Sequence, residues 1–197
     1  MSHLPRSPLS FTAFQALDKR GFEALLGPVV EHSAWVAANT WRVGPFNSWE
    51  ALFHAMANTL LGADKERQLA LLRAHPELAG QEAQAGTMTP ESQSEQGRLG
   101  MHRLTPEAFQ RLTSLNHRYQ ARFGFPFIAA LRLHASLDSV LADLAARLCN
   151  DADTERALAL GQVIQVMRGR LATTVSPDIA TPSSTSSTSP TSQSTLA

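Results

Sequence analysis

Several features that would assign a function at once are missing from this chain of 197 residues. It has one cysteine, Cys149, so it can form neither an intramolecular disulfide nor a CxxC redox or zinc pair. Lys and Arg together number 17, as do Asp and Glu, so the formal net charge is zero. Because nucleic-acid binders need clustered cations to displace counterions from phosphates, this balance argues against a nucleic-acid partner.

Long apolar runs are missing as well. Residues 1–8 lack the apolar segment of about 7 to 15 residues that marks a signal peptide, and nowhere do about 18 apolar residues stand together. We therefore expect a short flexible N-terminus over 1–8, a cytoplasmic location and no membrane contact.

The composition changes abruptly at the C-terminal end. Residues 176–197 contain 8 Ser, 5 Thr and 3 Pro, and Asp178 is the only charged residue among them. Such a segment has almost no apolar surface to bury, so it cannot offset an ordering cost of about 1 to 2 kcal/mol per residue. We expect a disordered tail over 176–197 and a single folded domain over 9–175.

Apolar spacing within 9–175 follows the helical period almost throughout. After Leu104 the apolar side chains recur every three or four residues, which places them on one face of a helix. Thr105 and Pro106 are expected to start that helix and Gly124 to end it. Two more faces of this kind follow at 137–148 and 157–171, and Asp153 is the expected N-cap of the last helix.

Helix-start residues also occur earlier in the chain. Ser48 and Asp64 precede two further apolar faces, and shorter helices are expected over 10–17, 20–26 and 33–40. No segment alternates with the period of two that marks a strand. The sequence therefore predicts an all-α fold, a single-domain bundle of about seven to nine helices. Two segments, 73–94 and 123–134, resist the helical pattern, and such departures are where function is most often found.

The first irregular segment presents a histidine. Since Pro76 disfavours helical geometry in the residue before it, His75 is expected to be extended at a helix exit, with its ring projecting outward. An imidazole titrates near pH 6.5 and can exchange a proton at neutral pH. The alternative is a surface histidine that caps the carbonyl end of the preceding helix.

The residues after Thr87 carry two overlapping helix-start signatures, Thr89 with Pro90 and the capping box from Ser92 to Glu95. In one interpretation they form only a well-capped helix. In the other, Ser92, Glu95 and Gln96 share one side of a helical turn and face a polar ligand. A carboxylate beside His75 would then fix its tautomer and favour its protonated form.

The second irregular segment is aromatic. Phe123, Phe125 and Phe127 flank Gly124 and Pro126, so the backbone there is irregular yet too apolar to lie in water. Its spare amide and carbonyl groups need partners, which a polar planar ligand could supply.

Arg132 follows this apolar run. Its planar guanidinium suits a carboxylate or a pair of carbonyls. A solvated arginine whose stem packs on the core is an equally good interpretation.

Together these motifs resemble OHCU decarboxylase, which converts 2-oxo-4-hydroxy-4-carboxy-5-ureidoimidazoline to (S)-allantoin in urate degradation. The resemblance spans residues 9–175 and rests on HPELAG at 75–80, SQSEQ at 92–96, LNHRY at 115–119, FGFPFI at 123–128, DTER at 153–156 and RGRL at 168–171. It implies an all-helical, cofactor-free enzyme that is commonly a homodimer. It also implies a small-molecule ureidoimidazoline as substrate and no metal.

The resemblance further implies residue roles. His75 would be the catalytic histidine and proton donor, Glu95 its neighbouring carboxylate and Arg132 a substrate anchor. The substrate-binding residues would be Pro76, Ser92, Gln93, Ser94, Glu95, Gln96, Phe127, Ile128, Ala129, Ala130 and Leu131.

Our hypothesis is that Arg132 and main-chain amides hold the carbonyl and ureido groups, while Glu95 orients His75. Loss of CO2 leaves negative charge on an adjacent carbonyl or imine, and His75 would stabilise it or protonate one face.

Two alternatives remain. One is a non-catalytic helical binding or scaffold domain, in which the motifs are only caps and core. The other is a metal hydrolase that uses His75, Glu95 and His102, which is weaker because the sequence lacks HExxH or an equivalent spacing.

Overall fold

The computed structural model describes residues 7–80, 83 and 85–177. In the described part of the chain the regular secondary structure is helical apart from one pair of two-residue strands, which confirms the predicted all-α class. The predicted N-terminus and tail lie outside the described residues, except for Ser7, Pro8, Ser176 and Pro177. The bounds of the α-helices are α1 (Phe11–Gln15), α2 (Lys19–Leu26), α3 (Trp35–Trp41), α4 (Trp49–Leu61), α5 (Lys65–Arg73), α7 (Pro90–Arg98), α8 (Pro106–Phe123), α9 (Leu137–Arg147) and α10 (Ala152–Thr174).

Polar side chains start most of these helices where the sequence predicted. The Ser48 hydroxyl accepts the N–H of Ala51 at 3.1 Å, and the Asp64 carboxylate accepts the N–H of Arg67 at 2.8 Å. These bonds satisfy donors that have no partner within the helix. Thr105 caps α8 in the same way, and Thr89, the first of the two overlapping start signatures, caps α7.

The predicted cap of α10 is wrong by two residues. Asp151, rather than Asp153, has the extended backbone of an N-cap, and its carboxylate accepts the N–H groups of Asp153 at 3.0 Å and Thr154 at 2.9 Å. Asp153 lies in the first helical turn, where its charge favours the positive end of the helix dipole.

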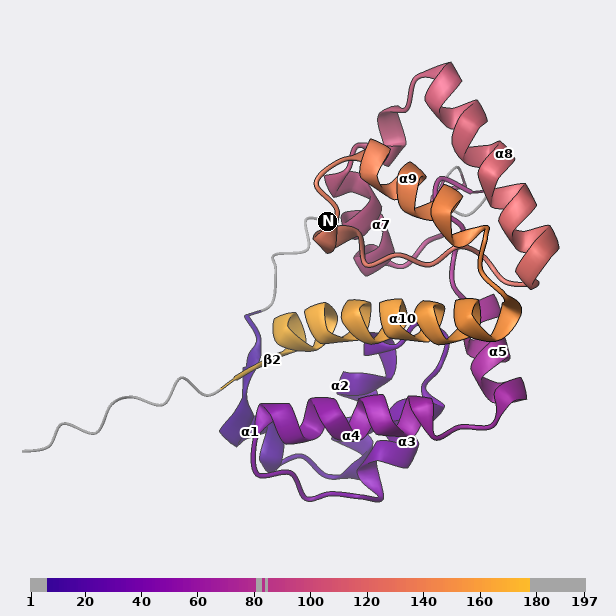
Figure 1. Ribbon diagram of the computed structural model, residues 1–197. Helices are drawn as coiled ribbons and strands as arrows, with labels where there is room; N and C mark the ends of the chain where they lie inside the picture. The colour runs from indigo at the N-terminus through magenta and orange to yellow at the C-terminus, as the bar shows by residue number, and fades with distance from the viewer. Residues whose placement is uncertain (1–6, 81–82, 84, 178–197) are drawn as a thin grey trace, which may run out of the picture.

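α10 crosses the middle of the molecule (Figure 1). Helices α2, α3 and α4 lie on one side of it, α7, α8 and α9 lie on the other, and α5 packs near its N-terminal end. Side chains of α10 that contribute to the core, such as Leu160, Val163 and Leu171, are almost fully buried. The long central helix therefore connects both halves of the core, and residues on it can reach a site formed between them.

A short parallel pair of strands closes the domain. β1 (Leu9–Ser10) pairs with β2 (Val175–Ser176), with Leu9 opposite Val175. The indole N–H of Trp49 donates to the carbonyl of Val175 at 2.8 Å and fixes β2 against α4. The sequence did not predict these strands, because two residues are too few for a periodic pattern.

Three 3₁₀ turns complete the chain: η1 (Gly27–Val29), η2 (Met101–Arg103) and η3 (Leu131–Leu133). Gly124 ends α8 in the left-handed conformation, with φ at 75°, as its position predicted. The chain then runs from Phe125 to Ala130 as buried, irregular backbone before η3 begins. No helix in the described part of the chain is long and apolar enough to cross a membrane.

Candidate active site

A small cavity of about 40 Å³ lies where the exit of α5, helix α7, the segment before η3 and helix α10 meet. It contains residues from the sequence motifs at 75–80, 92–96, 123–128 and 168–171, which are distant along the chain. The lining residues are Glu31, His75, Pro76, Leu78, Ser92, Glu95, Gln96, Phe127, Ile128, Ala129, Leu131, Val166 and Arg170.

His75 lies just past the end of α5, partly buried. Its Nδ1 is 2.9 Å from the carbonyl oxygen of Leu71. Because a carbonyl can only accept, Nδ1 carries the proton in the neutral ring, and Nε2 is the acceptor. Burial lowers the pKa of His75 below its ordinary value, although the bond to Leu71 and the charge of Glu31 act in the opposite direction. The ring is therefore neutral at neutral pH. It caps a helix carbonyl, as the alternative interpretation expected, but it lines the cavity and does not lie on the exposed surface.

Arg170 projects from α10 as a buried cation between two carboxylates. Its Nε and Nη2 donate to the two oxygens of Glu95 at 3.0 and 2.8 Å. Both Nη1 and Nη2 lie 3.4 Å from Oε2 of Glu31, and Nη2 also donates to Ser92 at 3.1 Å. Burial disfavours its charge, but the two carboxylates outweigh that cost and raise the pKa of Arg170 above its ordinary value.

Glu31 is almost fully buried between η1 and α3. The hydroxyls of Thr89 and Ser92 donate to its two oxygens at 2.6 and 2.7 Å. Burial alone would raise its pKa, yet these hydrogen bonds and the charge of Arg170 hold the pKa of Glu31 below its ordinary value. Glu31 is thus an anion that connects the N-terminal half of the domain to α7 and α10.

The predicted site residues of α7 lie on two different faces of the helix. Ser92, Glu95 and Gln96 line the cavity together, as their spacing predicted. Gln93 and Ser94 lie on the exposed side of the helix and do not line it.

The expected orientation of His75 by Glu95 is replaced by another arrangement. The carbonyl of Leu71 fixes the tautomer of His75, whereas Glu95 pairs with Arg170. The expectation that a carboxylate keeps His75 protonated is also reversed, because the pKa of His75 is lowered.

The structure does not bring Arg132 to this cavity. Its side chain is exposed, and Nη2 donates to the carbonyl and the side-chain oxygens of Gln165 at 3.0 and 2.9 Å. The η3 turn directs Leu131 inward and Arg132 outward across α10. The arginine that lines the cavity is Arg170 of α10.

Sequence reasoning missed Glu31 and Arg170. Arg170 lies within the motif at 168–171, three residues after Met167 and directly before Leu171, both core residues of α10. A cation on the buried face of a helix requires an acidic partner. The position of Arg170 among core residues could therefore have identified it as a candidate. Glu31 gives no comparable local signal, because its partner is 139 residues away.

The segment from Phe127 to Leu131 offers backbone donors. Phe127, Ile128, Ala129 and Leu131 line the cavity, while Ala130 is buried beside it and donates its N–H to Gln162 at 2.9 Å. In this buried stretch the N–H groups of Ile128, Ala129 and Leu131 donate to no other described residue. Such groups need a partner, and a bound ligand can be one.

Gln96 separates the cavity from a larger one of about 590 Å³. Its Oε1 accepts the N–H of Ala79 at 2.9 Å, and its Nε2 lies 3.2 Å from the sulfur of Met88. The larger cavity also borders Gly97, Leu104 and Phe109, among others. Gln96 therefore lies between the two cavities, with both ends of its amide engaged.

No group of three or more His, Cys, Asp or Glu in the described residues is placed to hold a metal ion. The side chain of His102, which the metal-hydrolase alternative requires, lies outside the described part of the structure. What the cavity contains is a neutral imidazole, a guanidinium fixed between two carboxylates and unpaired backbone donors. This set can accept and return a proton while it binds carbonyl oxygens.

Comparisons with known proteins agree on one family. Residues 15–172 match the family described as OHCU decarboxylase. Over 154 residues the chain is 39% identical to a 2-oxo-4-hydroxy-4-carboxy-5-ureidoimidazoline decarboxylase of Halalkalicoccus jeotgali, a match that covers 78% of this chain and 85% of the relative. The protein of the same name from Mus musculus is 36% identical over 156 residues, covering 79% and 87%.

A solved structure agrees as well. A crystal structure of (S)-allantoin synthase superposes with a TM-score of 0.68 at 28% identity. The match covers 85% of this chain and 54% of that chain, so this chain spans about half the length of that protein.

Proposed function

The chain belongs to the OHCU decarboxylase family, which acts in urate degradation, and on that premise we propose that it converts 2-oxo-4-hydroxy-4-carboxy-5-ureidoimidazoline to (S)-allantoin. The observation that carries the proposal is the pairing, in one cavity, of a neutral His75 with the cation of Arg170. The enzyme class is a carboxy-lyase, that is, a decarboxylase.

The reaction requires one bond to break and one carbon to be protonated. Loss of CO2 from ring carbon C4 leaves an electron pair that forms a C4–C5 double bond, while the pair of the C5–N1 imine moves to N1, which takes a proton from solvent. The intermediate is an enol with its hydroxyl on C4. It becomes allantoin when the hydroxyl proton leaves and a proton is added to C5.

His75 suits both proton transfers. In the neutral tautomer, Nε2 can accept the hydroxyl proton of the enol and then return the same proton to one face of C5. This keeps His75 as the proton donor that the sequence suggested, but it starts the cycle as a base. Delivery to a single face produces the S configuration.

Arg170 takes the anchoring role first given to Arg132. Its charge, held by Glu95 and Glu31, lies beside the cavity at all moderate pH values. Together with the N–H groups of Ile128 and Ala129, it would hold the ring carbonyl and the charge that develops as CO2 leaves. The substrate exceeds the small cavity, so we propose that its ureido group extends toward Gln96.

The test uses substrate generated from urate in solution and follows optical activity. Wild type is expected to give (S)-allantoin, and His75→Ala is expected to leave only the slow, racemic background. Racemic product at the background rate with wild type would overturn the proposal. The scaffold alternative predicts no effect of His75 on turnover.

We further propose a cytoplasmic homodimer that needs no cofactor and binds neither nucleic acid nor membrane. The balanced charge and the resemblance support this, and sedimentation of the purified protein tests the dimer.

A further inference from the structure

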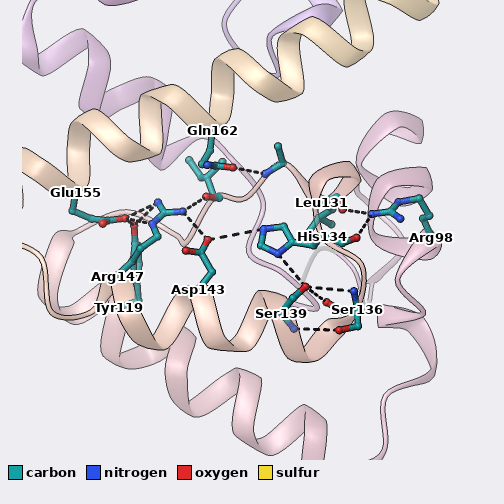
Figure 2. A network of polar contacts seen from close by, with 12 residues as sticks. Arg98, Tyr119, Leu131, His134, Ser136, Ser139, Asp143, Arg147, Glu155 and Gln162 are labelled. Carbon is teal, nitrogen blue, oxygen red and sulfur yellow. Dashed lines mark hydrogen bonds and ion pairs between the residues drawn. The ribbon is translucent and has the colours of Figure 1, made fainter.

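Figure 2 shows a buried polar cluster around Arg147, Glu155 and Tyr119, none of which lines the cavity. Arg147 of α9 donates from Nε and Nη2 to one oxygen of Glu155 on α10, at 2.9 and 2.6 Å. The hydroxyl of Tyr119 on α8 donates to the same oxygen. Asn150 donates to the other oxygen of Glu155 at 2.7 Å. Glu155 and Tyr119 are 0% exposed, so this is a fully desolvated carboxylate with four donors. Burial opposes the charge of Arg147, but the pair with Glu155 raises the pKa of Arg147 above its ordinary value.

The remaining donor of Arg147 reaches the substrate-binding segment. Its Nη1 donates to the carbonyl oxygen of Ile128 at 2.9 Å. The guanidinium also lies over the ring of Phe127, 4.6 Å from its centroid. One cation thus holds two consecutive residues that both line the cavity.

The peptide plane gives this contact a directional consequence. The carbonyl of Ile128 and the N–H of Ala129 belong to one planar trans unit, in which they point in opposite directions. Holding the carbonyl toward Arg147 therefore turns the N–H of Ala129 away from it. That N–H donates to no other described residue, and both residues line the cavity.

Other contacts fix only the far end of the segment. Gln162 accepts the N–H of Ala130 at 2.9 Å, and Arg98 donates to the carbonyls of Leu131 and His134. Among the described side chains, Arg147 alone donates a hydrogen bond to the backbone of Phe127 or Ile128.

We propose that Arg147, fixed by Glu155 and Tyr119, is a positioning residue that aims the N–H of Ala129 at the bound substrate. Its effect on turnover rests on the proposed function. Its effect on the direction of the amide does not, because that is a property of the free protein.

Two variants test this. Arg147→Lys retains a cation for Glu155 but loses the planar fork that donates in both directions. Arg147→Met alone would leave Glu155 buried without its cation, so the double variant R147M/E155Q removes both charges of that pair. Asp143, which lies 3.5 Å from Nη1 of Arg147, keeps its charge in the double variant, but its side chain is 32% exposed and water can hydrate it. Arg156→Met is the matched control, since Arg156 is a partly buried arginine next to Glu155 on α10 but contacts Gln68 and Asp153, away from the segment.

The readouts are kcat, KM and the dissociation constant for (S)-allantoin. We expect R147M/E155Q to bind (S)-allantoin about tenfold more weakly, the effect of losing about one hydrogen bond, and to lose at least as much in kcat/KM. Arg147→Lys should recover part of the loss, and Arg156→Met should stay within about twofold of wild type. The pH at which the rate falls in acid should not move, because His75 is untouched.

A folded double variant with wild-type affinity and kcat/KM would overturn the inference, as would an equal loss in Arg156→Met. If wild type itself shows no turnover, the proposed function fails, but the amide signal of Ala129 in ¹H–¹⁵N spectra of the free protein still decides. We expect it to shift in both Arg147 variants and not in Arg156→Met. An unchanged signal would overturn the inference whatever the enzyme does.

Discussion

Arg170 and Glu95 meet in a two-point contact, with Nε 3.0 Å and Nη2 2.8 Å from the two carboxylate oxygens. Paired in this way, Glu95 neither orients nor protonates His75. The ring takes its orientation from the carbonyl of Leu71 instead, and a carbonyl fixes the tautomer without adding a negative charge. In the proposed function, the site therefore separates two tasks, a fixed cation for anchoring and an uncharged base for proton transfer.

The neutral state of His75 predicts how the rate depends on pH. Because burial lowers the pKa of His75 below about 6.5, kcat/KM should stay level at neutral pH and fall only in more acidic solution, as the ring becomes protonated. His75→Gln should lower kcat by a factor of about 10² to 10⁴ and remove this acid limb. A wild-type rate that rises as the pH falls below 6.5 would contradict the role of a base.

The same pKa shift predicts a change in stability. The unfolded chain binds the His75 proton more tightly than the folded protein does, so the stabilising contribution is complete above about pH 6.5 and is lost as the pH falls through the folded pKa. Urea unfolding at pH 7 and pH 5 should therefore show a smaller acid-induced loss in His75→Gln than in wild type. If wild type and His75→Gln lost the same free energy of unfolding between pH 7 and pH 5, the pKa of His75 would be the same in the folded and unfolded chains.

Glu31 is predicted to set the position of the acid limb. Its negative charge raises the pKa of His75, so Glu31→Gln should lower that pKa further and move the limb to lower pH. Glu50→Gln is the control, because Glu50 is an exposed carboxylate that pairs with Arg168 on the surface. Measuring kcat/KM from about pH 4.5 to about pH 8, on both sides of the ordinary histidine pKa, checks both variants. A shift to higher pH in Glu31→Gln would contradict the electrostatic argument.

The two arginines considered as anchors should behave very differently. Arg170→Met leaves Glu31 and Glu95 without their cation, and loss of one partner from a buried ion pair costs about 3 to 5 kcal/mol. Arg132→Met removes only exposed contacts with Gln165, so its free energy of unfolding should change by less than about 0.5 kcal/mol.

Activity should also distinguish variants of these two arginines. Arg132→Met should keep kcat/KM within about threefold of wild type, whereas Arg170→Lys, which keeps a charge but not the two-point geometry, should lose about tenfold or more. If Arg132→Met lost most of its kcat/KM while Arg170→Lys kept the wild-type KM, Arg132 would again be assigned as the substrate anchor.

Much of the fold was predictable because its signals are local. Ser48, Asp64 and Thr105 cap the helices that the sequence assigned to them, since a cap depends only on the next three residues. The face formed by Ser92, Glu95 and Gln96 was predictable for the same reason: helical periodicity alone brings them together.

The rest depended on contacts between distant segments. Which arginine lines the cavity depends on the direction in which η3 turns Arg132 and on the burial of the α10 face that carries Arg170. Neither feature is visible in one short motif. Glu31 reaches the site across 61 residues to Ser92 and 139 to Arg170. The partner of His75 was mistaken because a main-chain carbonyl, which every residue has, leaves no mark on the sequence.

Two glycines with opposite roles provide the last prediction. Gly124 ends α8 with φ at 75°, and a Cβ there would meet no atom within 4 Å, so Gly124→Ala should pay only the conformational cost of the left-handed region, about 1 kcal/mol. Gly161 lies inside α10 with equally open space, so Gly161→Ala should raise the free energy of unfolding by about 0.5 to 1 kcal/mol. Thermal unfolding should then move by about 2 to 4 °C down for the first variant and by up to that amount upward for the second. Since both substitutions add the same methyl group, a shift of the same sign in the two would show that backbone conformation is not what distinguishes these positions.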